Sequence, residues 1–225
     1  MNDKQHDDFV MQQEQVKHDM LAYLESKYKK QFVVDSITYS NQTSDYQLSF
    51  HLRDNDQIHF FAYRNTVTQN MGDTFLLHYW DDEVTADFKQ MFIEVFPENP
   101  PLLYTPPGLM HFVKGQQQQL IDEGYPSFPQ IVLRYPSKFT MSLQIEIEIG
   151  ALHLSEEQYQ ERIFQIINYY RDRGITLEGM RVRLLENRKD NIAKFILDII
   201  NQTEFNKVTQ INDLKSHWRK VNANK

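Results

Sequence analysis

Residues 49–60, SFHLRDNDQIHF, contain two runs of alternating apolar and polar residues around a short polar turn. Side chains alternate between the two faces of a strand, so apolar residues of paired strands must meet on one face. A three-residue turn at 54–56 satisfies this rule, because it pairs Leu52 with Ile58 and Phe50 with Phe60. The stretch therefore predicts an antiparallel hairpin, and on its other face His51 lies opposite His59.

The residues around this hairpin predict a layer of helix on sheet. An apolar stripe at steps of four predicts a helix over 8–29. Four strands are predicted over 31–40, 45–53, 57–64 and 73–80 because β-branched and aromatic residues are dense there. A second helix is predicted from 81 until Pro97 ends it, with Asp81 or Asp82 as its cap.

The second half of the chain mixes the same elements. Residues 138–150 alternate most clearly, and with 130–135 they predict a hairpin that turns at Pro136-Ser137. A capping box of Ser155 and Gln158 predicts a helix that stops at Gly174. Further predictions are a short helix within 109–124, a strand over 180–186, and two final helices. The first of these helices carries Ile192, Phe195, Ile196 and Ile199, and the second carries Leu214, Trp218 and Val221.

The prolines suggest where the chain divides. All eight fall between Pro97 and Pro136, and five of them lie in 97–107. Proline fixes φ and removes a backbone donor, so this stretch predicts an extended linker over 98–109. We therefore expect an α+β protein of two small domains, 1–97 and 110–225, each a mainly antiparallel sheet packed with helices.

Composition excludes several classes of function. The chain has 225 residues, a net charge of −7 and no cysteine, which excludes disulfides, thiolate zinc sites and a cysteine nucleophile. The negative charge argues against nucleic acid as a partner, and no apolar run is long enough to span a membrane. Motifs for phosphate cradles, for nucleophile elbows and for zinc-protease helices are missing, so no cofactor and no catalytic residue is predicted.

The paired histidines are the first candidate site. Two imidazoles on opposed strand positions could share a Zn²⁺ ion, but a zinc site needs three or four ligands. His78 could supply a third ligand if its segment lies alongside as a strand. An ordinary cross-strand pair is the favoured interpretation, so no metal is predicted. Phe61 and Tyr63 share the same outward face, and we predict a binding surface there.

Three charged clusters have simpler explanations than catalysis. Glu146 and Glu148 could form an acid–base pair, but Arg181 and Arg183 on a later strand favour cross-strand ion pairs. The acids in residues 80–87 suit a helix N-terminus better than a calcium loop. The basic residues near the C-terminus could meet an anionic surface, but a terminal helix docked on the core is favoured.

A family resemblance covers about the first 90 residues. The pattern of Tyr23, Leu24, Lys27, Tyr28 and Phe32, followed by the strand-like runs, resembles small cystatin-like α+β domains of lipoproteins from Gram-positive bacteria. The resemblance implies a helix followed by a curled antiparallel sheet, attachment to the cell envelope, and no catalysis.

These observations favour a non-catalytic protein that binds another protein, as the soluble part of an envelope lipoprotein. One alternative is a hydrolase with a cleft at the domain junction, lined by Tyr104, His111 and Tyr125. Another is an acidic intracellular regulatory or immunity-type protein that masks a basic partner. The chain as written reads as cytoplasmic, or as part of the cell envelope or an extracellular protein if a leader has been removed. Its oligomeric state is left open.

Overall fold

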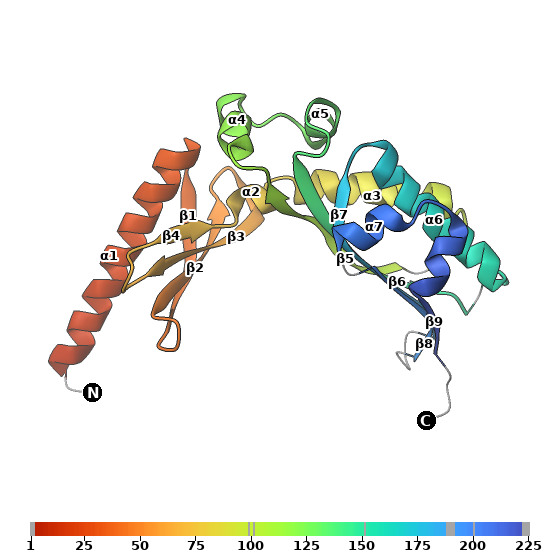
Figure 1. Ribbon diagram of the computed structural model, residues 1–225. Coiled ribbons are helices and arrows are strands. Elements are labelled where there is room, and N and C mark those ends of the chain that lie inside the picture. The colour runs from red at the N-terminus through yellow and green to blue at the C-terminus, as the bar shows by residue number, and fades with distance from the viewer. Residues whose placement is uncertain are drawn as a thin grey trace. The chain divides into compact units, whose positions relative to one another are not determined.

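A computed structural model describes residues 3–98, 100, 102–150, 152–187, 192–199 and 201–221 (Figure 1). The chain divides into two compact units, Met1–Tyr79 and Trp80–Lys225. Each unit contains helices and one β-sheet, and the pairing of strands within both sheets is mainly antiparallel. The predicted α+β class is therefore confirmed.

The first unit is one long helix on a four-stranded antiparallel sheet. Helix α1 (Asp3–Tyr28) precedes strands β1 (Phe32–Ser40), β2 (Asp45–Leu52), β3 (Asn55–Asn65) and β4 (Met71–Asp73), and the short helix α2 (Phe75–His78) follows. The strands lie in the order β1-β2-β3-β4, and α1 contacts β1 and β3 (Figure 1).

The core of this unit uses the stripes that the sequence predicts. The residues of α1 at steps of four and the inward residues of β2 and β3 are all buried; they are Val16, Met20, Leu24, Tyr28, Tyr46, Leu48, Phe50, Leu52, Phe60 and Ala62. Phe32 and Phe75 pack edge to face with 5.0 Å between ring centroids, which joins β1 to α2. Burial of this face turns the opposite side chains of the strands outward.

The hairpin pairs largely as predicted. Phe50 opposes Phe60, and His51 opposes His59. The turn itself is different, because the register shifts after His51 and Leu52 pairs with Asn55 rather than with Ile58. The irregularity lies at the tip, so it leaves the predicted faces of the two strands unchanged.

The second unit is built on a five-stranded mixed sheet in the order β5-β6-β7-β8-β9. Its strands are β5 (Leu102–Phe112), β6 (Phe139–Glu148), β7 (Thr176–Asn187), β8 (Ile192–Ile199) and β9 (Trp218–Lys220). Its helices are α3 (Asp81–Val95), α4 (Gln116–Asp122), α5 (Phe128–Arg134), α6 (Glu156–Asp172), α7 (Gln202–Lys207) and the 3-10 turn η1 (Ile211–Ser216). Within the described part of the chain, β6 and β7 are the one parallel pair of strands, and α6 makes the crossover between them.

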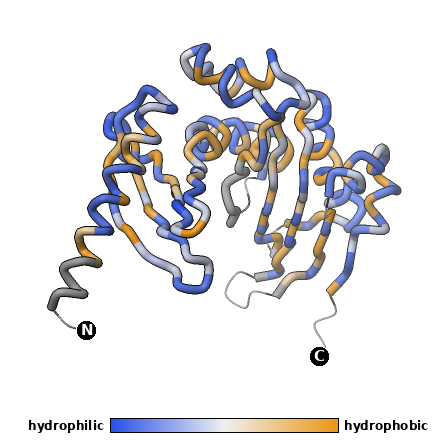
Figure 2. The backbone as a smooth tube through the Cα atoms, turned by 60° about the vertical axis from the view of Figure 1, so that its left-hand side comes forward, coloured by the Kyte–Doolittle hydropathy of each residue, from blue (hydrophilic) through white to orange (hydrophobic). Residues whose placement is uncertain are grey.

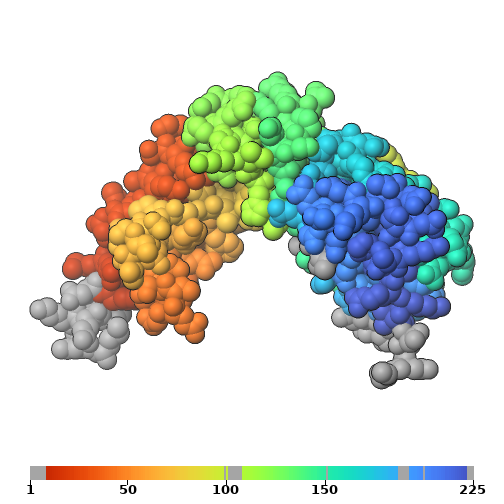
Figure 3. Space-filling view, in the orientation of Figure 1, coloured from red at the N-terminus to blue at the C-terminus, as the bar shows by residue number. Residues whose placement is uncertain are grey.

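One face of this sheet is buried under helices. Hydrophobic residues gather along its strands (Figure 2), and every second residue of β6 from Phe139 to Ile147 is buried. Helix α6 contributes Ile163, Ile166 and Tyr170 to the same core. Residues 201–221 form part of the surface of this unit, shown in blue in Figure 3. Their anchors are the buried side chains of Phe205, Leu214 and Trp218.

The predicted linker is a strand of the second sheet. Residues 102–112 form β5 and pair with β6 despite Pro106 and Pro107, where the register shifts. An edge strand tolerates proline because the backbone groups on its outer side have no neighbouring strand to bond to. The division of the chain lies instead between Tyr79 and Trp80, so α3 belongs to the second unit and the predicted boundary is wrong.

Several short apolar runs adopt the opposite structure to the one predicted. Residues 75–78 are helical rather than extended, and α5 replaces the strand predicted over 130–135, so the hairpin at Pro136-Ser137 does not form. Conversely, 192–199 form β8 rather than a helix, and Trp218 lies in β9. Short apolar runs are compatible with the periodicity of a helix or of a strand, and packing against the rest of the unit decides which of the two forms.

The signals at helix ends were more reliable. Ser155 and Gln158 form the predicted capping box, with the Ser155 Oγ accepting from the Gln158 N–H at 3.2 Å. Gly174 ends α6 with φ of 69°. At α3 the N-cap is Trp80, so Asp81 and Asp82 lie in the first turn rather than at the cap. Among the described residues, no helix is both long and apolar enough to cross a bilayer.

Candidate functional site

The outer face of the first sheet carries most of the predicted site residues. We use this name for the side chains of β1–β4 that point away from α1; they include Asp35, Ser36, Thr38, Asp45, Gln47, Ser49, His51, His59, Phe61 and Tyr63. His51, His59, Phe61 and Tyr63 share this face, as the alternation predicts.

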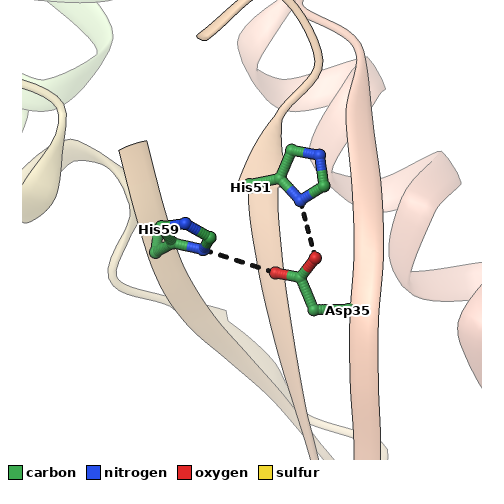
Figure 4. Close-up of side chains that lie close together, drawn as sticks. All are labelled: Asp35, His51 and His59. Carbon is green, nitrogen blue, oxygen red and sulfur yellow. Dashed lines mark hydrogen bonds and ion pairs between the residues drawn. The ribbon is translucent and has the colours of Figure 1, made fainter. Parts of the chain in front are cut away.

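The two histidines converge on a carboxylate that the sequence analysis did not include. The His51 Nδ1 atom lies 2.6 Å from Oδ1 of Asp35, and the His59 Nδ1 atom lies 3.5 Å from Oδ2. The Asp35 carboxylate sits between the two rings (Figure 4), whose centroids are 5.8 Å apart. Three neighbouring strands therefore bring two imidazole nitrogens and a carboxylate together, with ligand atoms that all lie within 4.8 Å of one another.

A β-bulge puts Asp35 in this position. Val34 pairs with Phe50, whereas Ser36 pairs with Ser49, so Asp35 is the extra residue on β1. A bulge inserts one residue and redirects its side chain. The sequence does contain a signal for it. The apolar alternation of β1 runs through Phe32 and Val34, then changes phase and continues through Ile37.

The predicted third histidine is elsewhere. His78 ends α2 and is not on a strand beside β3, so the suggestion that it completes the pair is wrong. An acidic residue, Asp35, completes the cluster instead. It lies on β1, which pairs with β2 on the side away from β3. Sequence spacing could not find it because strand order was unknown.

Aromatic side chains and a hollow occupy the remainder of the outer face. Phe61 and Tyr63 are 51% and 49% exposed, a large fraction for aromatic residues on a sheet. A hollow of about 420 Å³ lies among Thr38, Asp45, Gln47, Phe61 and Tyr63 with their neighbours. The Oγ atoms of Ser36 and Ser49 are 2.8 Å apart between this hollow and the histidine cluster.

Tyr63 rests on Gly72, and this contact gives a testable prediction. A Cβ atom at Gly72 would overlap the outer atoms of the Tyr63 ring. We expect Gly72→Ala to displace the ring, with a loss of stability of no more than about 1 kcal/mol because the ring is half exposed and can rotate away. In NMR spectra the ring-current shift at residue 72 should disappear. Gly108→Ala, where nothing within 4 Å of an added Cβ is found in the described structure, is the control. A retained ring-current shift in Gly72→Ala would contradict the prediction.

Two of the other predicted site residues lie far apart on one strand. Tyr104 and His111 lie seven positions apart on β5, which corresponds to roughly 20 Å of strand. The side chain of Tyr104 lies outside the described residues. His111 is exposed, with its Nε2 atom 3.5 Å from Glu178, and Tyr125 follows α4 in a left-handed conformation with φ of 62°. The cluster on which the hydrolase alternative depended is therefore not assembled by β5 alone.

One of the predicted cross-strand ion pairs of the second unit forms. Glu146 opposes Arg183 across the parallel pair of β6 and β7 and bonds to it. Arg181 pairs instead with Asp198 on β8 at 2.6 Å, and Arg219 reaches the same carboxylate at 2.7 Å. Glu146 therefore has a structural explanation that requires no acid–base chemistry.

Comparison with known proteins adds little to this geometry. No family model matches the chain, and no curated protein matches it either. Among solved structures, the chain is similar to a DUF5037 family protein from Ruminococcus gnavus, at 11% identity and a TM-score of 0.39, over 86% of this chain and 78% of that one. A likeness of this strength carries no argument about function.

Proposed function

We propose that the protein is a non-catalytic binding protein that takes a lysine- or arginine-bearing segment of another protein on the outer face of its first sheet. The observation that carries the proposal is the pair of half-exposed aromatic rings, Phe61 and Tyr63, beside a hollow on that face. Aromatic residues are enriched at the centres of protein interfaces, where they supply most of the binding energy.

Charge supports a basic partner. Asp45 points outward from β2 beside the hollow, and none of the strand residues on this face is a lysine or arginine. The whole chain has a net charge of −7. A negative surface steers positively charged partners toward it and disfavours acidic ones.

The aromatic rings give the same preference. A lysine or arginine side chain over the face of a tyrosine or phenylalanine ring gains about 0.5–2 kcal/mol, and its aliphatic part covers apolar surface. The chain already uses this interaction within its first unit, where the Lys30 Nζ lies 5.2 Å from the centroid of the Tyr79 ring. Phe61 and Tyr63 present aromatic rings, half exposed, on the outer face.

The proposal predicts charge-selective binding. We expect short peptides that carry lysine and arginine to bind saturably in fluorescence anisotropy, and peptides of the same length that carry aspartate and glutamate not to bind. The double variant Phe61→Ala/Tyr63→Ala should weaken binding by about tenfold or more, because it removes both aromatic anchors.

Val67→Ala is the matched control, since Val67 is an exposed hydrophobic residue of the same unit that lies outside the strands. Its affinity for the basic peptides should equal that of the wild type. Equal binding of acidic and basic peptides, or an unchanged affinity in the double variant, would contradict the proposal.

The location of the protein is a separate proposal. We infer a place in the cell envelope from the resemblance of residues 23–32 and the following strands to lipoprotein domains. The order of one helix and then an antiparallel sheet supports it. Fractionation of cells that express the full-length gene tests it, because an envelope protein will appear in the membrane or wall fraction and a cytoplasmic one in the soluble lysate.

A further inference from the structure

We propose that Asp35, His51 and His59 form a binding site for a divalent transition-metal ion of the Zn²⁺ class. The site would have three protein ligands and at least one open position. The proposal does not depend on the peptide-binding role, since it concerns an ion alone and a different end of the outer face.

The donor atoms match the preferences of such an ion. Zn²⁺ is bound by imidazole nitrogen and carboxylate oxygen at about 2.0–2.2 Å, and sites with three protein ligands keep a further position for water or another group. Imidazole also suits Cu²⁺ and Ni²⁺, whereas Mg²⁺ and Ca²⁺ require oxygen ligands. Two histidines and one aspartate therefore select against the two commonest divalent ions.

The distances are close to those of a coordinated set. Ligands of a tetrahedral ion with bonds of this length lie about 3.3–3.5 Å apart. The distance of 3.5 Å between His59 Nδ1 and Asp35 Oδ2 already fits. The distance of 2.6 Å between His51 Nδ1 and Asp35 Oδ1 must increase by about 0.7–0.9 Å on binding of the ion. The ligand nitrogens of His51 and His59 lie within 4.8 Å of each other. Because the His59 side chain is 61% exposed, small rotations of it can shorten this distance to that of a coordinated pair.

The supporting structure is rigid. All three residues are on strands rather than loops, and directly beneath the two histidines the rings of Phe50 and Phe60 stack at 5.5 Å in the core. The bulge fixes Asp35 on the same side. Sites built on regular elements hold their ligands more precisely than sites on loops.

Local charge also favours a cation. The carboxylate of Asp35 is the one acid in the cluster, and it lies between two groups that are neutral when they act as ligands (Figure 4). A bound divalent ion would therefore leave a positive charge at this end of the face. The His51 side chain is 22% exposed, so the ion would be partly shielded from water.

Isothermal titration with ZnCl₂ alone tests the site. We expect one Zn²⁺ ion per chain, and we expect each of Asp35→Asn, His51→Ala and His59→Ala to raise the dissociation constant by about tenfold or more, because even outer-shell changes cost that much. CoCl₂ should bind at the same site and give visible absorption bands of the coordinated ion, and MgCl₂ and CaCl₂ should not compete.

His18→Ala is the matched control. The His18 Nδ1 lies 3.8 Å from Asp19, so it is also a histidine beside a carboxylate, but no second histidine joins it in the described structure. Its zinc affinity should be that of the wild type. Zinc affinity unchanged in both His51→Ala and His59→Ala, or lost in His18→Ala, would overturn the proposal, as would no saturable zinc binding at all. His59→Gln keeps the test decisive if an alanine variant folds poorly.

Discussion

Replacing Asp73 with alanine will lower the free energy of unfolding of the first unit by about 3–5 kcal/mol, the cost of breaking a buried ion pair. The Asp73 side chain is 1% exposed and accepts hydrogen bonds from Lys27 Nζ at 2.8 Å and from the hydroxyl of Tyr28 at 2.6 Å. Tyr23 donates a third bond at 3.2 Å. The carboxylate thereby ties the last turns of α1 to the end of β4, and without it these donors lose their shared acceptor.

The protonation of Lys27 reflects the same contact. Burial by itself would lower the pKa of Lys27, but the hydrogen bond and charge of Asp73 outweigh this effect and hold the pKa above its ordinary value. Lys27 is therefore positively charged at neutral pH, although its side chain is half-buried. Its removal together with Asp73 should cost less than the sum of the two single changes, because neither charge is then left unpaired.

Hydrogen exchange followed by mass spectrometry will measure the effect within the first unit. Peptides from α1 and β3 should lose protection in Asp73→Ala. Asp54→Ala is the control, because Asp54 is an exposed acid in the hairpin turn of the same unit and its loss should change stability by no more than about 0.5 kcal/mol. Equal protection in the two variants would show that the buried network does not stabilise the unit.

Replacing Trp80 with alanine will cost the second unit about 3–5 kcal/mol, the usual range for truncation of a fully buried aromatic residue. The side chain is completely buried, and its Nε1–H donates to the carbonyl of Pro126 at 2.9 Å. Its ring centroid lies 6.1 Å from that of Phe112 on β5. Truncation leaves a cavity between α3 and β5 and also leaves the Pro126 carbonyl without its donor.

Trp218 provides a matched comparison in the same unit. Its ring packs on Phe195 at 5.4 Å, but its buried Nε1–H has no hydrogen-bond partner among the described residues. Trp218→Phe should therefore cost less than Trp80→Phe, because only the latter removes a made hydrogen bond. Urea unfolding followed by circular dichroism will rank the variants, and a larger loss in Trp218→Phe would contradict the argument.

Long, strictly periodic segments were predictable because a single face of each was enough to specify it. The alternation in β2 and β6 and the four-residue stripe of α1 each require one buried side, whatever element covers it. The capping residues of α6 work at still shorter range. For the same reason the opposition of His51 and His59 followed from matching the core faces of two neighbouring strands.

Short apolar runs could not be assigned in this way. Residues 75–78, 130–135 and 192–199 are apolar enough to be buried as helix or strand, and their surroundings in the folded unit choose between the two. The proline-rich segment misled for a related reason. Proline prevents hydrogen bonding on only one side of a strand, so an edge strand can contain it. The residues of β5 alone do not indicate that this strand lies at the edge of its sheet.

The sequence by itself determined the fold class, the buried faces of α1, β2 and β6 and the outward face that His51, His59, Phe61 and Tyr63 share, because these depend on periodicity within one or two adjacent segments. Only the tertiary structure decided that Asp35 joins the two histidines. That meeting requires the order of three strands and a bulge in one of them, which are settled when the whole sheet closes over its core.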